Sequence, residues 1–171
     1  MTVEVLGIDR VIRRLERMKR ELESKNHEFI EKLALEGIEV ADSHFSNAIY
    51  DGVNDVSPGQ IVWLSDNEAQ IVVSGTTVLF IEFGTGITYT DQHELAGKYG
   101  YVRVGYGQGK GANPKGWIYK GEPGTNGIPV KGRPAGVYRT KGNPPARAMY
   151  LAGKAMRDRV EETAREVFGN G

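Results

Sequence analysis

The histidines and their acidic neighbours are the residues of this chain that could bind a metal ion or carry out acid–base chemistry. Asp42 and His44 stand two positions apart in a segment with helical periodicity, which places their side chains on different faces of a helix. Asp91, His93 and Glu94 lie together in a predicted loop, but their spacing matches no pattern of metal ligands. The sequence contains no cysteine, which excludes a thiolate metal site and a cysteine nucleophile. We therefore predict no metal site and no cofactor.

The glycine-rich run at residues 105–111 resembles a phosphate-binding loop only in its composition. Such a loop opens onto the N-terminus of a helix, where backbone amides and the helix dipole face the anion. Here Asn113-Pro114 and further loop residues follow instead. No serine stands in the Gly-x-Ser-x-Gly motif of a hydrolase, and Ser74-Gly75 falls in a predicted turn. These observations predict that the protein is not an enzyme.

Helical periodicity dominates both ends of the sequence. Apolar residues recur at steps of three and four over residues 8–22, and a wider apolar face follows over residues 29–45. The pattern breaks near residues 25–27, where we expect a bend or a change of register in one long helix. A final helix is predicted to begin at residues 143–145, because proline is tolerated in a first helical turn, and to end at the glycines of residues 169–171.

The middle of the chain has the composition of β-strands and turns. Residues 60–64, 69–74 and 77–83 are rich in β-forming residues and are separated by short turns, which predicts an antiparallel meander. Residues 87–142 form a long glycine-rich excursion, in which 116–120 and 136–140 are expected to pair as short strands.

Together these elements predict one α+β domain over residues 1–171. It consists of a long, bent N-terminal helix, the meander, the 87–142 excursion and a C-terminal helix packed on the sheet. The predicted core side chains are those of Leu33, Ile38, Phe45, Val72, Phe80, Met149, Met156 and Val160. No apolar run approaches the length of a membrane span, so we expect a soluble protein made inside the cell.

The charges are balanced over the whole chain but divided along it. Residues 28–94 hold 12 acidic residues and one basic residue, a net charge of −11, whereas residues 98–147 hold ten basic residues and one acidic residue, a net charge of +9. Both segments can be solvated surface, or the basic segment can contact the acidic segment of a neighbouring subunit. Glu82 can face solvent from a strand or meet a basic group of the same or a neighbouring subunit. The candidate interface residues are Glu82, Trp117, Lys131, Arg133, Arg139 and Lys141.

Four segments carry a resemblance to a known family. They are the Gly-Ile-Asp-Arg-Val opening of the first helix at residues 7–11, the small apolar residues of the following helical stretch, the Phe-Ile-Glu-Phe-Gly-Thr-Gly run at 80–86, and the Asn-Pro-Pro-Ala-Arg entry to the last helix at 143–147. This pattern resembles the tail-completion, or head–tail joining, proteins of the neck of long-tailed bacteriophages. The resemblance spans both ends of the chain but not the excursion.

The resemblance implies a structural virion protein, either a tail-completion or a tail-terminator protein, that forms a homo-oligomeric ring, for which we expect a hexamer, at the top of the tail. Its partners would be neighbouring head-connector proteins and the tail tube protein, with DNA passing through the lumen without sequence-specific binding. Such a subunit is assembled in the host cytoplasm and carries no catalytic residue or cofactor. The alternative is a nucleic-acid-binding module that uses the basic, aromatic loop at 98–147, since stacking and phosphate contacts together hold single strands.

Overall fold

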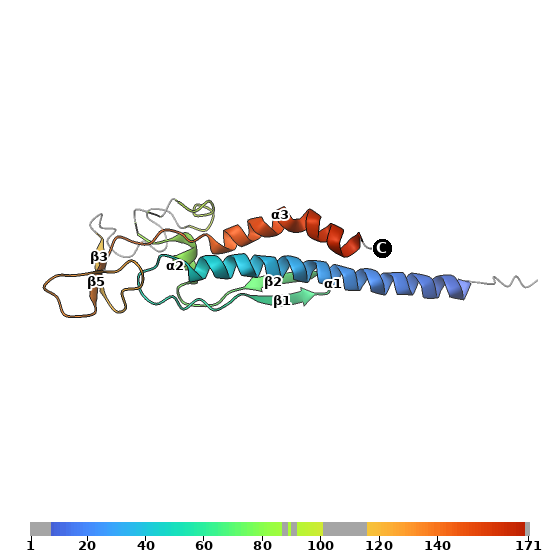
Figure 1. Ribbon diagram of the computed structural model, residues 1–171, viewed down its shortest axis with the longest axis horizontal. Helices are drawn as coiled ribbons and strands as arrows, with labels where there is room; N and C mark the ends of the chain where they lie inside the picture. The colour runs from blue at the N-terminus through green and yellow to red at the C-terminus, as the bar shows by residue number, and fades with distance from the viewer. Residues whose placement is uncertain (1–7, 87–88, 90–91, 101–115, 170–171) are drawn as a thin grey trace, which may run out of the picture.

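The computed structural model describes residues 8–86, 89, 92–100 and 116–169, which form an elongated α+β arrangement (Figure 1). Helix α1, Ile8–Ser46, has 39 residues and is therefore about 58 Å long. The helix continues through residues 25–27 without interruption and shows no sharp bend there (Figure 1). The change of pattern instead marks the point where other elements begin to cover α1.

A two-stranded hairpin covers one side of the second half of α1. Strands β1, Gln60–Ser65, and β2, Glu68–Val72, pair antiparallel as predicted. The hairpin lies along α1, where Trp63 stacks on His27 with ring centroids 3.8 Å apart. The amide of Asn26 donates a hydrogen bond of 2.6 Å to Asn67 at the hairpin turn. The hairpin therefore begins to cover α1 where the sequence pattern changes.

The third predicted strand is wrong, because Val78–Phe83 forms a short helix, α2. Its residues favour β-structure, but tertiary contacts override such a preference in a short segment. On the helix, Ile81 is buried in the core cluster while Glu82 points at the start of the C-terminal helix. The expected meander is thus a hairpin followed by a helical turn.

A second small sheet lies at one end of the molecule (Figure 1). Strands β3, Trp117–Lys120, and β5, Val137–Thr140, pair antiparallel, which confirms the predicted pairing within the excursion. A third strand, β4, Ile128–Pro129, adds to β5 and was not predicted. The sheet is attached to the body through Thr125, whose N–H donates to the carbonyl of Tyr50 over 2.7 Å.

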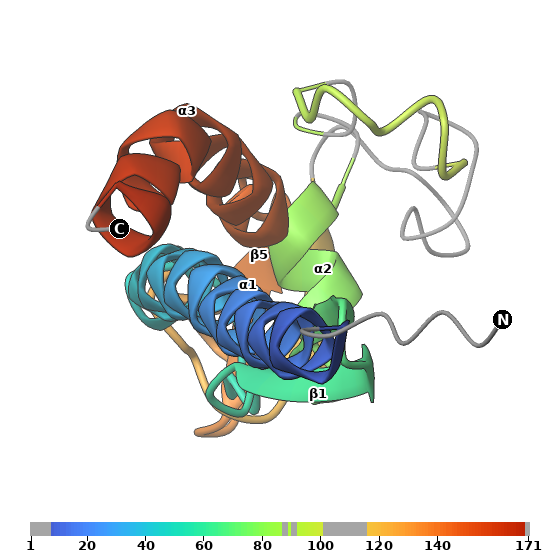
Figure 2. The ribbon, with the colours of Figure 1, turned by 90° about the vertical axis from the view of Figure 1, so that its right-hand side faces the viewer.

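The C-terminal helix α3, Ala148–Phe168, packs on α1 and not mainly on a sheet as expected. Figure 2 shows α1 between α3 on one side and the hairpin on the other. Helix α3 begins after residues 143–145, since Arg147 adopts a left-handed conformation with φ of 56° just before its first residue. At the far end, the rings of Phe29 and Phe168 lie 5.7 Å apart.

The core depends on small side chains, which let α1 and α3 approach closely. Its fully buried residues are Ala41, Phe45, Ile81, Ala148 and Ala152. Of the eight predicted core residues only Phe45 is fully buried, and Val72 and Val160 are exposed. The other five are partly buried. In the part of the chain that the structure describes, no helix is long and apolar enough to cross a membrane.

Truncating Phe45 to alanine tests this core. The ring is only 2% exposed, so Phe45→Ala should lower the free energy of unfolding by about 3–5 kcal/mol. Val160→Ala, at a position 43% exposed, should cost less than about 1 kcal/mol in the same urea titration. Equal losses would show that this core is misassigned.

Candidate functional site

The two motifs at residues 80–86 and 143–147 lie against each other and form one hydrogen-bonded junction. Thr85 and Asn143 exchange backbone hydrogen bonds of 2.9 and 3.2 Å, and Ala146 donates to the carbonyl of Ile81 over 2.8 Å. Gly84 sits between them with φ of 77° and ψ of 173°, a conformation that is almost confined to glycine. A Cβ atom there would lie 2.7 Å from the carbonyl oxygen of Asn143. The junction therefore requires the glycine of the first motif.

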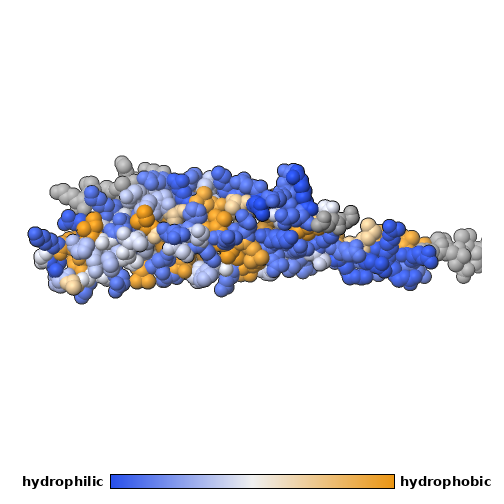
Figure 3. Space-filling view, viewed as in Figure 1, coloured by the Kyte–Doolittle hydropathy of each residue, from blue (hydrophilic) through white to orange (hydrophobic). Residues whose placement is uncertain are grey.

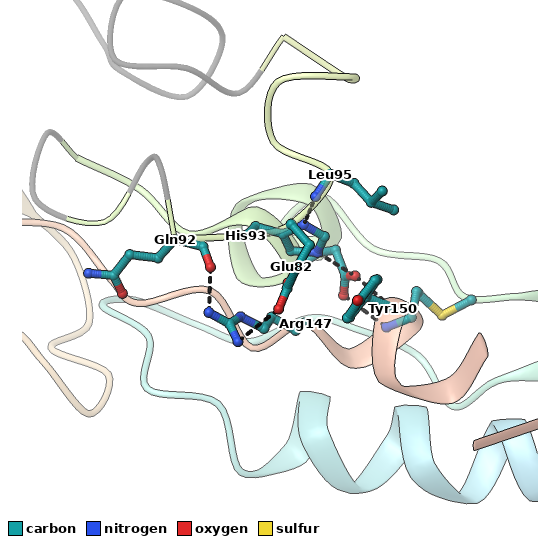
Figure 4. A network of polar contacts seen from close by, with 8 residues as sticks. Glu82, Gln92, His93, Leu95, Arg147 and Tyr150 are labelled. Atoms are coloured by element: carbon teal, nitrogen blue, oxygen red, sulfur yellow. Dashed lines mark hydrogen bonds and ion pairs between the residues drawn. The ribbon is translucent and has the colours of Figure 1, made fainter. Parts of the chain in front are cut away.

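Glu82 caps the N-terminus of α3 from a different helix. Its carboxylate accepts hydrogen bonds from the backbone N–H groups of Met149, at 2.9 Å, and Tyr150, at 3.0 Å (Figure 4). Arg147, the residue at the cap position, makes no side-chain cap bond of its own. The first N–H groups of a helix lack partners within the helix, and a negative charge there also interacts favourably with the helix dipole. Glu82 supplies both the missing hydrogen-bond acceptor and the negative charge.

His93 completes the burial of this carboxylate. Its Nε2 lies 3.2 Å from Oε1 of Glu82, and its Nδ1 accepts the N–H of Leu95 over 3.0 Å. The bond to Nδ1 assigns the proton to Nε2, which then donates to Glu82. Both ring nitrogens and both carboxylate oxygens are thus engaged within the chain. This arrangement suits a structural pair better than an acid–base pair.

Arg147 attaches the loop around His93 to the same junction. Its guanidinium lies 3.2 Å from the carboxylate of Glu94 and donates to the carbonyl of Gln92 (Figure 4). The loop is therefore held to the start of α3 by two polar contacts besides the His93–Glu82 pair. Among the described residues, no group of three or more histidine and acidic side chains could hold a metal ion.

Asp55 holds the other end of α2. Its carboxylate accepts bonds from the side-chain hydroxyls and backbone N–H groups of Thr76 and Thr77, which stand just before the helix. The hydroxyl of Thr76, followed by that of Thr77, lowers the pKa of Asp55 well below its usual range. The short helix that carries Glu82 is thus positioned from both ends.

Five of the six candidate interface residues come together at the end of the molecule that carries the second sheet. Trp117 lies on β3, Arg139 on β5, and the other three in the adjoining segments, and all five side chains are exposed. We call this set the basic end, made up of Trp117, Lys131, Arg133, Arg139 and Lys141. Within the described residues none of its four cations makes an ion pair, because each described pair joins other side chains.

Glu82 does not belong to this surface. It is 4% exposed and was expected on a strand, facing solvent or a basic group. The structure places it on a helix and brings it to His93 of the same chain. Because its carboxylate is enclosed, Glu82 is not available to a neighbouring subunit.

The acidic segment is less available for contacts than its charge suggests. Seven of its 12 carboxylates form hydrogen bonds or ion pairs within the chain, namely those of Glu28, Glu36, Asp42, Asp51, Asp55, Glu82 and Glu94. Asp91 lies outside the described residues. The carboxylates without a partner among the described residues are those of Glu31, Glu39, Asp66 and Glu68, on α1 and at the hairpin turn.

Besides the junction and the basic end, the first half of α1 carries a third notable surface, an exposed apolar stripe along the helix. Its apolar residues repeat regularly in the sequence, and the structure leaves this part of the helix uncovered (Figure 3). Six large apolar side chains there are between 47% and 60% exposed, those of Ile8, Val11, Ile12, Leu15, Met18 and Leu22. The dense charge around the stripe, and its separation from the wider apolar face at residues 29–45, were the signals that it lies outside the core.

Comparisons with known proteins add nothing to this description. A scan against protein-family models found no match, and searches of curated proteins and of solved structures likewise found none.

Replacing Glu82 tests whether the junction depends on its carboxylate. Glu82→Ala leaves two backbone N–H groups and the His93 ring without their acceptor, so the free energy of unfolding should fall by about 3 kcal/mol or more. Glu94→Ala removes a carboxylate that is 41% exposed and should cost no more than about 1 kcal/mol. Chemical denaturation measures both, and similar losses would contradict the role of Glu82.

The lowered pKa of Asp55 predicts a dependence of stability on pH. The unfolded chain binds the proton more readily, so the carboxylate stabilises the fold above its unfolded pKa of about 3.9. This contribution is lost as the pH falls through that value toward the lower folded pKa. The melting temperature of the wild type should therefore fall more steeply below about pH 4 than that of Asp55→Asn. If the melting temperatures of the two proteins fall in parallel with pH, Asp55 does not contribute to the acid sensitivity of the fold.

Proposed function

We propose that this chain is a structural subunit of the neck or upper tail of a long-tailed bacteriophage, where copies of it form a ring. The observation that carries the proposal is the motif junction. The two most distinctive segments of the family resemblance, far apart in sequence, build one unit in which Gly84 and Glu82 have specific roles. The resemblance thus rests on residues that position each other.

The surface charges support a head-to-tail contact between subunits. A closed ring needs two different, complementary patches on each subunit. The basic end supplies one patch. The carboxylates of Glu31, Glu39, Asp66 and Glu68, which have no partner among the described residues, supply acidic groups for the other. The two patches lie on different parts of an elongated molecule, the former at its end and the latter along its length (Figure 1). Contacts of this kind mainly raise the association rate and set the register.

In this proposal the ring, for which we expect six copies, lies between the head connector and the tail tube. DNA passes through the lumen without sequence-specific contacts. In this proposal the subunit has a structural role, and the Glu82–His93 pair contributes to its fold.

A second candidate function, nucleic-acid binding, is favoured by one observation. Trp117 is 38% exposed on the small sheet that also carries Arg139, and Lys131, Arg133 and Lys141 lie in the segments that adjoin this sheet. None of these four cations has an ion pair among the described residues. Exposed aromatic rings and cations on one surface can stack on bases and contact phosphates. A monomer that binds single-stranded DNA with a steep salt dependence would favour this function over the ring.

Charge reversal at the basic end tests the ring. Changing Lys131, Arg133, Arg139 and Lys141 to glutamate should slow assembly at low salt, and added salt should partly restore it by screening the new repulsion. Light scattering coupled to size-exclusion chromatography measures the assembled mass, and negative-stain microscopy shows whether rings close.

A matched control uses two cations on α3. Arg139→Glu with Lys141→Glu should slow assembly, whereas Lys154→Glu with Arg157→Glu changes the charge equally at other exposed positions and should not. If the fourfold reversal leaves assembly unchanged at both salt levels, the basic end is not a subunit contact.

A further inference from the structure

The exposed stripe on the first half of α1 has the spacing of a helix-pairing surface. Ile8, Leu15 and Leu22 stand seven residues apart, with Val11 and Met18 between them, which is the heptad pattern of two packed helices. Each of these five side chains is at least 49% exposed in the part of the chain that the structure describes. A stripe of this kind needs a partner to remove it from water.

The stripe continues the face of α1 that packs on α3. Phe29, one heptad after Leu22, contacts Phe168 in the last turn of α3. Helix α3 ends there, while about half of α1 extends beyond it (Figure 1). The uncovered stripe is thus the remainder of a face already used for helix packing, which identifies its occupant as another helix.

We propose that this half of α1 pairs with the same half of a second copy of the chain, in antiparallel orientation. In this register Leu15 lies opposite Met18 of the second copy, and Val11 lies opposite Leu22 of the second copy. The paired segments, residues 8–25, are about 27 Å long. The contact is two-fold symmetric, so each of these two side-chain pairs occurs twice in the dimer.

The charges beside the stripe favour the antiparallel orientation. There Arg14 lies beside Glu21 of the second copy, and two-fold symmetry makes this favourable pair twice. In a parallel pair Arg14 would instead lie beside Lys19 of the second copy, again twice. Like charges at these flanking positions oppose pairing, so the sequence selects the direction.

The position of α3 favours the same orientation. In a parallel pair the second helix would continue past residue 29 into the space that α3 occupies on α1. In the antiparallel pair the N-terminal end of the second helix points toward the end of α3, and the body of the second copy lies at the opposite end of the pair. The second helix therefore covers the exposed half of α1 without displacing α3.

This inference does not rest on the proposed ring. A two-fold contact joins two copies and does not close a ring, so it is separate from the head-to-tail contact at the basic end. The Arg139→Glu, Lys141→Glu variant, which is expected to disturb ring assembly, should still pair through α1. The experiments can therefore show that one proposal is wrong while the other still holds.

Sedimentation of the full chain over a concentration series tests the pairing. We expect a dimer with a Kd of about 10 μM or below, and Leu15→Glu should raise that Kd at least about tenfold. Leu35→Glu is the matched control, because Leu35 is also exposed on α1, at 53%, but lies outside the stripe. A chain that stays monomeric at about 100 μM, or a dimer that Leu15→Glu leaves intact, would overturn the proposal.

Two further variants test the orientation. Arg14→Glu should weaken the antiparallel dimer, because the new carboxylate faces Glu21, whereas it would strengthen a parallel one by facing Lys19. Since the chain has no cysteine, Val11→Cys and Leu22→Cys variants report on geometry directly. Oxidising a mixture of the two should give a mixed disulfide in an antiparallel dimer. If Val11→Cys alone crosslinks efficiently with itself, or Arg14→Glu tightens the dimer, the antiparallel arrangement is wrong.

Discussion

The capping of α3 by Glu82 is the interaction on which the arrangement of this protein depends. A buried carboxylate is costly unless its oxygens are fully engaged, and here two backbone N–H groups and His93 engage them. In return, α3 begins at a defined residue and lies along α1. This capping requires helix α2, because the helix places the Glu82 carboxylate at the N-terminus of α3 while the Ile81 side chain packs in the core.

The same junction determines what the molecule presents to its surroundings. Asn143 is fully buried and connects the motif at 80–86 to the turn that anchors the second sheet, through Thr85 and Asn126. The basic end is therefore attached to the junction and held away from the protruding half of α1. This polar network thus keeps the charged basic end and the exposed apolar half of α1 at opposite ends of the molecule (Figure 1).

The segments with strong, regular patterns were predictable from the sequence. The two terminal helices, the β1–β2 hairpin and the β3–β5 pair follow from periodicity, turn residues and β-propensity. The core was predicted less well. A periodic apolar stripe identifies a helix face but not the element that covers it, and so Val160 and the residues of the first stripe remain exposed.

The sequence by itself determined that this is an α+β chain with long helices at both ends, divided charge and no cysteine chemistry. Only the tertiary structure decided that Val78–Phe83 is helical and that Glu82 is enclosed, because both depend on a helix N-terminus that lies far away along the chain. It likewise decided which carboxylates of the acidic segment are engaged, since six of the seven engaged ones meet partners that lie far away in the sequence, and only Glu28 has a partner four residues away. Local periodicity reports which residues share a face, whereas burial and pairing depend on contacts between distant segments.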